Sequence, residues 1–168
     1  PNILINTAAF TNVELAEKKR NEVLMINGFS VGNIARECAK RNILLIHFSS
    51  DYVFDGLKKS PYSEKDLPCP LNYYGYSKLI GEQEIKKSGC NFYIFRISWL
   101  ISNYGNNFLK VILRKAQNDG IINVVNNQYG VPTSTKLIAK IVKSLIDDYL
   151  NGSEWGKGIY HLTPNGKA

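Results

Sequence analysis

The sequence predicts an α/β fold in which helices alternate with the strands of a parallel sheet. Short apolar runs of strand length recur along the chain, and longer segments with apolar residues at helical spacing separate them. Polar residues follow directly after several of these runs, which is where open α/β sheets place their chemistry. The 168 residues, 44% of them hydrophobic, are enough for one domain with a substantial core.

The first half of the chain contains the strands and helices expected to position a site. Two apolar runs predict strands, and two long segments with helical spacing predict helices. A polar stretch between the first strand and the first long helix predicts a surface helix or turn. Pro68, Pro70 and Asn72 mark a loop before the second long helix. The predicted strands are 2–6 and 43–48, the helices are 21–41 and the segment from about 74 to 87, and the polar stretch is 12–19.

The second half continues the alternation. A strand over 91–97 leads to a helix that begins within 105–110, whose inward residues we expect to be Phe108, Val111, Ile112 and Ala116. Residues 121–125 are read as a short strand and 126–133 as a turn-rich loop. Ser134 is a candidate cap for a last helix with a strong apolar stripe, and 158–163 is read as a final strand.

Composition restricts the partners. The net charge of +7 suits an anionic ligand such as a nucleoside diphosphate or a dinucleotide, but the basic residues are dispersed, so we expect no nucleic-acid partner. Three cysteines without metal-ligand spacing are read as free thiols in a reducing cytoplasm, and two histidines argue against a histidine-based metal site. No apolar run reaches membrane-spanning length, so we expect no membrane partner.

One pair of residues carries a candidate chemistry. Tyr74 and Lys78 are four positions apart, which places both on one face of a helix, one turn from each other. A free phenol titrates at about 10, and a neighbouring cation lowers that pKa, which makes a tyrosine a usable general acid at neutral pH. Ser50 follows the predicted 43–48 strand, where its hydroxyl can hydrogen-bond a carbonyl oxygen while Tyr74 protonates it.

The order of strand-end serine, tyrosine and lysine resembles the short-chain dehydrogenases/reductases, and the chain looks most like the dTDP-4-dehydrorhamnose reductase family in their extended branch. The resemblance implies a Rossmann-like, doubly wound parallel sheet. The chain has no G-x-G-x-x-G turn, so we expect roughly 60 residues of N-terminal βαβ structure, and the C-terminal helices, to lie outside it. The matching blocks are NTAAFT at 6–11, SSDYVFDG at 49–56, PLNYYGYSK at 70–78, RISW at 96–99 and NQYGVPT at 127–133.

The same resemblance implies an activity and a site. Hydride from NADPH or NADH would reduce the 4-keto group of a dTDP-linked 6-deoxyhexose. Tyr74 would donate the proton, Lys78 would lower its pKa and hold the cofactor ribose, and Ser50 would orient the carbonyl. An asparagine, Asn27, is assigned to a water-linked proton relay. The other cofactor-binding residues implied are Ala8, Ala9, Phe10 and Thr11, and the substrate-binding residues are Ser50, Asp51, Trp99, Gln128, Pro132 and Thr133.

The implied organisation is a single NAD(P)-binding domain fragment over 1–168, with part of the substrate-binding region around 99–133 and 151–168. No metal ligand set is implied, and a requirement for Mg²⁺ cannot be read from this sequence. A homodimer is one possible assembly. Serine stands at position 50 where threonine is frequent in the family, a change that keeps the hydroxyl.

Two alternatives stay open. A regulatory partner of methionine adenosyltransferase shares this fold and much of the same motifs, including Tyr-Gly-x-x-Lys, without being a catalyst. A reductase of another nucleotide-linked 4-keto sugar would carry the same catalytic residues. Trp99 and the 106–108 segment resemble the reductase rather than the regulator.

Overall fold

The computed structural model describes residues 1–105, 107–120, 122–153 and 155–166. These residues form two compact units, which we describe separately. The first unit contains residues 1–96 and 157–161, and the second contains the described residues of 97–156 and 162–168. All three predicted catalytic residues, Ser50, Tyr74 and Lys78, belong to the first unit, so its architecture comes first.

The first unit is built on a four-stranded sheet with the order β1-β2-β3-β6. β1 runs parallel to β2, with Asn6 beside His47, and β3 runs parallel to β6, with Arg96 beside His161. The predicted α/β fold with a parallel sheet is therefore confirmed. The strands are β1 (Ile3–Asn6), β2 (Leu44–Ser50), β3 (Phe92–Ile97) and β6 (Gly158–His161).

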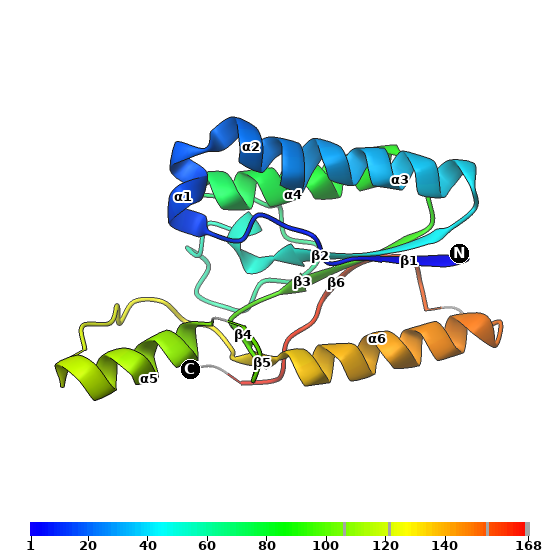
Figure 1. The fold of residues 1–168 in the computed structure, drawn as a ribbon. Helices are drawn as coiled ribbons and strands as arrows, with labels where there is room; N and C mark the ends of the chain where they lie inside the picture. Colours follow the sequence, from blue (N-terminus) through cyan, green and yellow to red (C-terminus); the bar gives the residue numbers. More distant parts are fainter. Residues whose placement is uncertain (106, 121, 154, 167–168) are drawn as a thin grey trace. The chain divides into compact units, whose positions relative to one another are not determined.

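Helices cover one face of this sheet (Figure 1). The predicted helix over 21–41 is observed as α2 (Arg20–Leu24) and α3 (Ser30–Lys40), joined by a π-helical turn, η1 (Met25–Phe29). The long helix α4 (Tyr73–Lys87) lies beside them, and the predicted polar segment forms α1 (Val13–Lys18). A short 3₁₀ turn, η2 (Asp51–Val53), follows β2 directly.

The core between this sheet and its helices shows which side chains of β2 face the helices. Ile43 and Leu45 belong to one buried cluster with Val31 of α3 and Ile85 of α4. Because successive side chains of a strand point to opposite faces, the other odd-numbered residues of β2 also face the helices. The buried side chains at positions 47 and 49 therefore point toward the helical layer.

The second unit contains a two-stranded parallel sheet of β4 (Leu100–Ile101) and β5 (Thr133–Ser134). Its helices are α5 (Phe108–Asp119) and α6 (Thr135–Leu150). α6 begins directly after Ser134, as predicted, although the serine side chain makes no capping hydrogen bond among the described residues. Within α6, Ile138, Val142 and Leu145 are buried, in agreement with the predicted apolar stripe.

Two predictions for the second unit are wrong. The residues of α5 predicted to face inward include Phe108 and Val111, which are 64% and 41% exposed, and Ala116, which is exposed as well. The two-residue ladder of β4 and β5 offers little apolar surface for a helix to cover. Residues 122–125 form no strand, since no described strand takes up their backbone hydrogen bonds; Ile121 lies outside the described residues. No described helix combines the length and the apolar character needed to cross a membrane.

Candidate active site

The start of α4 is held directly against the turn that follows β2. Asn72 caps the helix, because its side chain accepts a hydrogen bond of 2.8 Å from the Gly75 backbone N–H. A Cβ at Gly75 would lie 2.0 Å from the carbonyl oxygen of Tyr52, so only glycine permits this approach. The Tyr52 and Tyr74 rings meet edge to face at 5.6 Å. Packing at this point therefore fixes Tyr74 against the end of β2.

Ser50 and Tyr74 meet there. The Ser50 side chain accepts from the Tyr52 N–H at 3.2 Å and donates to Asp51 Oδ1 at 3.0 Å, and it lies close enough to the Tyr74 phenol to act on its pKa. Partial burial raises the pKa of the Asp51 carboxyl, and the Ser50 hydrogen bond opposes that rise. A serine hydroxyl has one proton, so it can serve Asp51 or an incoming carbonyl oxygen, but not both at once.

The expected lowering of the Tyr74 pKa by Lys78 is wrong for this structure. Burial raises the pKa of Tyr74 to about 12, although the Ser50 hydroxyl beside the phenol opposes the rise. Lys78 instead directs its ammonium group at the backbone of β2, where Nζ donates to the Phe48 carbonyl oxygen at 2.6 Å. Tyr74 therefore keeps its proton throughout the physiological pH range.

Lys78 is almost completely enclosed, with 2% of its surface exposed. Burial lowers the pKa of Lys78 to about 8, and the carboxylate of Glu82, one turn later on α4, partly opposes the shift. The Phe48 carbonyl is the one hydrogen-bond acceptor that the described residues offer this ammonium. An ammonium group has three protons, so Lys78 keeps donor capacity for other acceptors.

The turn after β1, where the resemblance places cofactor-binding residues, is held by two asparagines, Asn6 at the end of β1 and Asn27 of the helical layer. Asn6 Oδ1 accepts from the Ala8 N–H at 3.1 Å, and Asn27 Oδ1 accepts from the Phe10 N–H at 2.8 Å. Asn27 Nδ2 donates to the Phe10 carbonyl and to Ser77 Oγ, both at 3.0 Å. Ala9 and Phe10 are half-buried, whereas Ala8 and Thr11 are exposed.

Asn27 occupies the π-helical turn η1 and is fully buried. The close packing extends to the backbone, since a Cβ at Gly81 of α4 would lie 2.3 Å from the Asn27 carbonyl oxygen. Both amide protons of the side chain are used by Phe10 and Ser77, so the structure gives Asn27 a positioning contact between the turn after β1 and α4. A water-linked relay through Asn27 stays a prediction.

The remaining predicted substrate residues gather in the second unit. Trp99 has a left-handed backbone with φ of 42°, which is uncommon for a residue other than glycine. Its carbonyl accepts from the Thr133 N–H at 3.0 Å, and its ring packs so closely on Gly130 that a Cβ there would lie 2.5 Å from Cε2. Gln128 and Pro132 are exposed in the same loop.

Thr133 itself is fully buried, and its hydroxyl donates to the Val131 carbonyl at 3.1 Å. The structure thus brings Ser50, Asp51, Tyr74 and Lys78 together within the first unit, and groups Trp99 with the loop that ends at Thr133 within the second.

The structure adds residues that the sequence did not single out. Glu17 Oε1 accepts from the Tyr73 N–H at 2.6 Å, and the Arg20 guanidinium lies 5.1 Å from the centre of the Tyr73 ring, so the start of α4 is anchored to α1 and α2. No local pattern could reveal a contact between residues 56 positions apart. Gly75, by contrast, lies inside the motif that was singled out, and its role in packing is visible only in three dimensions.

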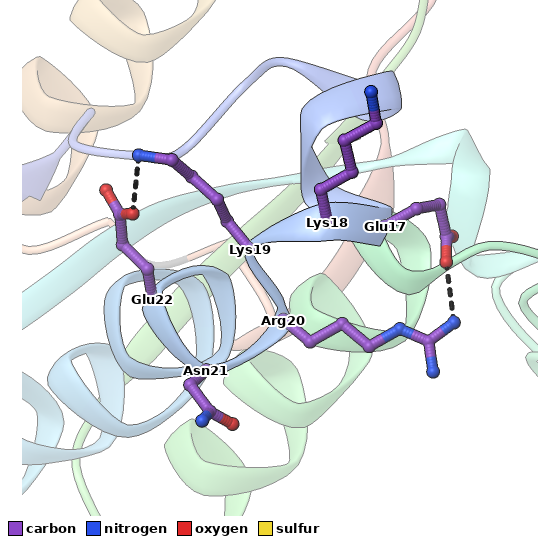
Figure 2. A pocket seen from close by; sticks show the side chains of 6 residues that line it. All are labelled: Glu17, Lys18, Lys19, Arg20, Asn21 and Glu22. Carbon is purple, nitrogen blue, oxygen red and sulfur yellow. Dashed lines mark hydrogen bonds and ion pairs between the residues drawn. The ribbon is translucent and has the colours of Figure 1, made fainter.

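Figure 2 shows an open hollow at the α1–α2 junction, lined by one continuous segment, Glu17 to Glu22. Its charges pair with one another, Arg20 with Glu17 at 2.8 Å and Lys19 with Glu22 at 2.9 Å. None of the predicted site residues line it. Among the described residues, no group of three or more His, Cys, Asp or Glu side chains could hold a metal ion.

Comparisons with known proteins identify the family of the chain. The family model described as "RmlD substrate binding domain" matches residues 1–168. The chain is 40% identical over 169 residues to a dTDP-4-dehydrorhamnose reductase of Sinorhizobium fredii, covering 100% of this chain and 57% of that protein. It is 34% identical to a dTDP-4-keto-6-deoxy-D-glucose reductase of Streptomyces niveus, again covering 100% of this chain and 57% of the relative.

Among solved structures, a dTDP-4-dehydrorhamnose reductase of Bacillus anthracis in complex with NADP superposes with a TM-score of 0.89 at 37% identity, covering 99% of this chain and 57% of that one. The chain thus spans a little over half the length of the relatives that it matches.

Proposed function

The chain belongs to the family of the RmlD substrate binding domain, and on this premise we propose that the protein carrying it reduces the 4-keto group of a dTDP-linked 6-deoxyhexose. The observation that carries the proposal is the meeting of Ser50, Tyr74 and Lys78 in the first unit. The Ser50 hydroxyl lies close enough to the Tyr74 phenol to act on its pKa, and Lys78 follows one helical turn later with its ammonium on the Phe48 carbonyl.

Each of these groups has one task in the proposed reaction. Tyr74, whose phenol holds its proton at neutral pH, donates that proton to the carbonyl oxygen of the sugar. Ser50 turns its hydroxyl from Asp51 to the same oxygen and stabilises the negative charge that develops there. Asp51, next to Ser50, borders the substrate. Lys78, one helical turn after Tyr74, holds its ammonium on the Phe48 carbonyl and offers its remaining protons to the cofactor ribose.

The residues present fit the nicotinamide end of NADPH or NADH, which supplies the hydride when bound. Lys78 keeps unused protons for ribose hydroxyls, and the Tyr74 phenol lies on the same helix face. The small side chains Ala8 and Ala9 leave the backbone of the turn after β1 accessible, and Asn27 fixes that turn beside α4. The solved Bacillus anthracis relative contains NADP, which supports the choice of a nicotinamide cofactor.

A second candidate differs only in the sugar. The 34% identical Streptomyces relative is named for reducing dTDP-4-keto-6-deoxy-D-glucose, and nothing in the Ser50–Tyr74–Lys78 arrangement distinguishes one 4-keto sugar from another. The residues that would discriminate them, Trp99 and the exposed Gln128, belong to the second unit.

One assay tests these readings together. The full-length protein is mixed with NADPH and, in parallel, with dTDP-4-dehydro-6-deoxy-L-mannose or dTDP-4-keto-6-deoxy-D-glucose, with no other protein present. We expect oxidation of NADPH with the first sugar nucleotide. Oxidation only with the second would establish the alternative substrate. No oxidation with either, together with tight binding to a methionine adenosyltransferase, would support the regulatory reading instead.

A further inference from the structure

We propose that His47, Ser49 and Lys78 enclose a binding site for one buried water molecule between β2 and α4, and that this water positions the Lys78 ammonium for cofactor binding. Its role toward Lys78 rests on the proposed function. The water site itself follows from the arrangement of the three side chains.

The first step is the direction of the two β2 side chains. His47 and Ser49 share the face of β2 that carries Leu45, and Leu45 packs in one cluster with Ile85 of α4. Both side chains are buried, His47 completely and Ser49 with 3% of its surface exposed. Two residues apart on a strand, they stand about 7 Å from each other. Lys78 Nζ binds the carbonyl of Phe48, the residue between them, at 2.6 Å.

The second step is the tautomer of His47. Asn6 Oδ1 accepts from the Ala8 N–H at 3.1 Å, so the other end of the Asn6 amide, Nδ2, donates to His47 Nδ1 at 3.2 Å. Burial and the nearby charge of Lys78 hold the pKa of His47 well below its ordinary value, so the ring is neutral. Because Nδ1 accepts, the ring proton must be on Nε2.

The third step is a count of donors and acceptors. His47 Nε2 and Ser49 Oγ are the two buried side-chain atoms without a hydrogen-bond partner among the described residues. Buried polar groups are normally satisfied, by protein or by ordered water, and a buried water makes two to four hydrogen bonds. A water at this point would accept from His47 Nε2–H and from Lys78, and would donate to Ser49 Oγ. The three groups therefore match the bonding capacity of one water molecule.

This arrangement accounts for all three protons of Lys78. One goes to the Phe48 carbonyl and one to the water, which leaves a single N–H in a fixed direction for a ribose hydroxyl of the cofactor. His47 and Ser49 are thus positioning residues, since they act on the cofactor only through the water and Lys78. Without the water, the Phe48 carbonyl alone would hold the ammonium, and two of its three protons would be left to other acceptors.

Two measurements test the site independently of any reaction. In a crystal structure of the full-length protein at a resolution that shows waters, we expect an ordered water within hydrogen-bonding distance of His47 Nε2, Ser49 Oγ and Lys78 Nζ. A protein group occupying that position would overturn the proposal. In ¹⁵N NMR spectra, His47 should stay neutral with its proton on Nε2. The signals that a His47→Gln variant loses are those of the His47 ring; a proton on Nδ1 would equally overturn the proposal.

A third measurement tests the role of the water. Ser49→Ala removes the acceptor of the water and changes little volume, so we expect the KM for NADPH to rise roughly tenfold, the equivalent of one hydrogen bond to a charged group, with an unchanged KM for the sugar nucleotide. The matched control is Leu45→Val, which creates a small cavity on the same face of β2 and should leave both KM values unchanged. Equal effects of the two variants would refute the positioning role. A protein that shows the water but reduces neither sugar nucleotide contradicts the proposed function instead.

Discussion

A methyl group added at Gly75 should disable the site without unfolding the protein. In Gly75→Ala the new Cβ would lie 2.0 Å from the Tyr52 carbonyl oxygen and 2.8 Å from its carbon. Real Cβ atoms essentially never come closer than 3.0 Å, so α4 and η2 must separate by at least 1.0 Å, the difference between 3.0 and 2.0 Å. Both clashing atoms belong to backbone, and no side-chain rotation can relieve them.

The displacement acts on the two residues that flank the contact. Tyr74 precedes Gly75 on α4, and Ser50, the last residue of β2, precedes the η2 turn, so the separation of α4 from η2 moves the phenol away from the serine hydroxyl. A misplacement of about 1 Å can reduce the rate about 10²-fold. Overpacking costs roughly 1–3 kcal/mol of stability, but alanine recovers about 1 kcal/mol of helix propensity relative to glycine, so unfolding should become easier only by about 0–2 kcal/mol.

The assay compares kcat for NADPH oxidation and the free energy of unfolding in urea for Gly75→Ala and a control, Gly28→Ala. At Gly28 the added Cβ meets only side chains, Ile80 Cγ2 at 3.0 Å and Leu24 Cδ1 at 3.2 Å. We expect kcat of Gly28→Ala within about threefold of the parent and a loss near 10² for Gly75→Ala. A Gly75→Ala protein with the kcat of the parent would refute the reasoning that this contact sets the site geometry.

Three further predictions concern charge and packing. Because burial lowers the pKa of Lys78 from 10.5 to about 8, the unfolded state binds more protons between these pH values, and the free energy of unfolding should rise with pH across that window. Above pH 8, kcat should fall as the ammonium deprotonates. Lys78→Met should abolish the rise in stability, and a variant that still shows this rise in urea titrations would contradict the assignment. Arg96 and Glu82 form a buried bidentate ion pair, at 2.9 and 2.7 Å. Arg96→Met should leave an unpaired buried carboxylate and reduce the free energy of unfolding in urea by about 3–5 kcal/mol. A reduction below about 1 kcal/mol, the value of an exposed pair, would contradict this prediction. Trp99→Ala should raise the KM for the sugar nucleotide with a small change in melting temperature, because the ring is only half-buried against Gly130; a large fall in melting temperature with an unchanged KM would identify Trp99 as core.

The fold of the first unit could be predicted because its periodic patterns are long and its strands are continuous apolar runs. The π-helical turn at 25–29 could not, since residues in a π turn keep the composition of an ordinary helix. Its cause is tertiary: Asn27 must reach Phe10 and Ser77 while its own backbone packs on Gly81. In the second unit, the apolar spacing of α5 predicted buried residues that are exposed in the structure, because apolar spacing predicts burial only where a partner surface exists.

The candidate site was predictable in its members but not in its electrostatics. The spacing of Tyr74 and Lys78 correctly places them one turn apart on α4, and Ser50 lies at the end of β2 as expected. The direction of the Tyr74 pKa was predicted wrongly, because sequence spacing does not reveal that Lys78 binds the Phe48 carbonyl or that burial dominates at the phenol. Gly75 and Glu17 shape the same site through contacts that no motif encodes.

The central claim is that Tyr74 supplies the proton in a reduction by NADPH. The most direct test is the kcat of Tyr74→Phe in the full-length protein with dTDP-4-dehydro-6-deoxy-L-mannose, measured together with the Kd for NADPH. Loss of the proton donor should reduce kcat by about 10²–10⁴-fold, the usual contribution of general acid catalysis, while the Kd for NADPH changes little. A Tyr74→Phe protein whose kcat stays within about threefold of the parent would contradict the claim.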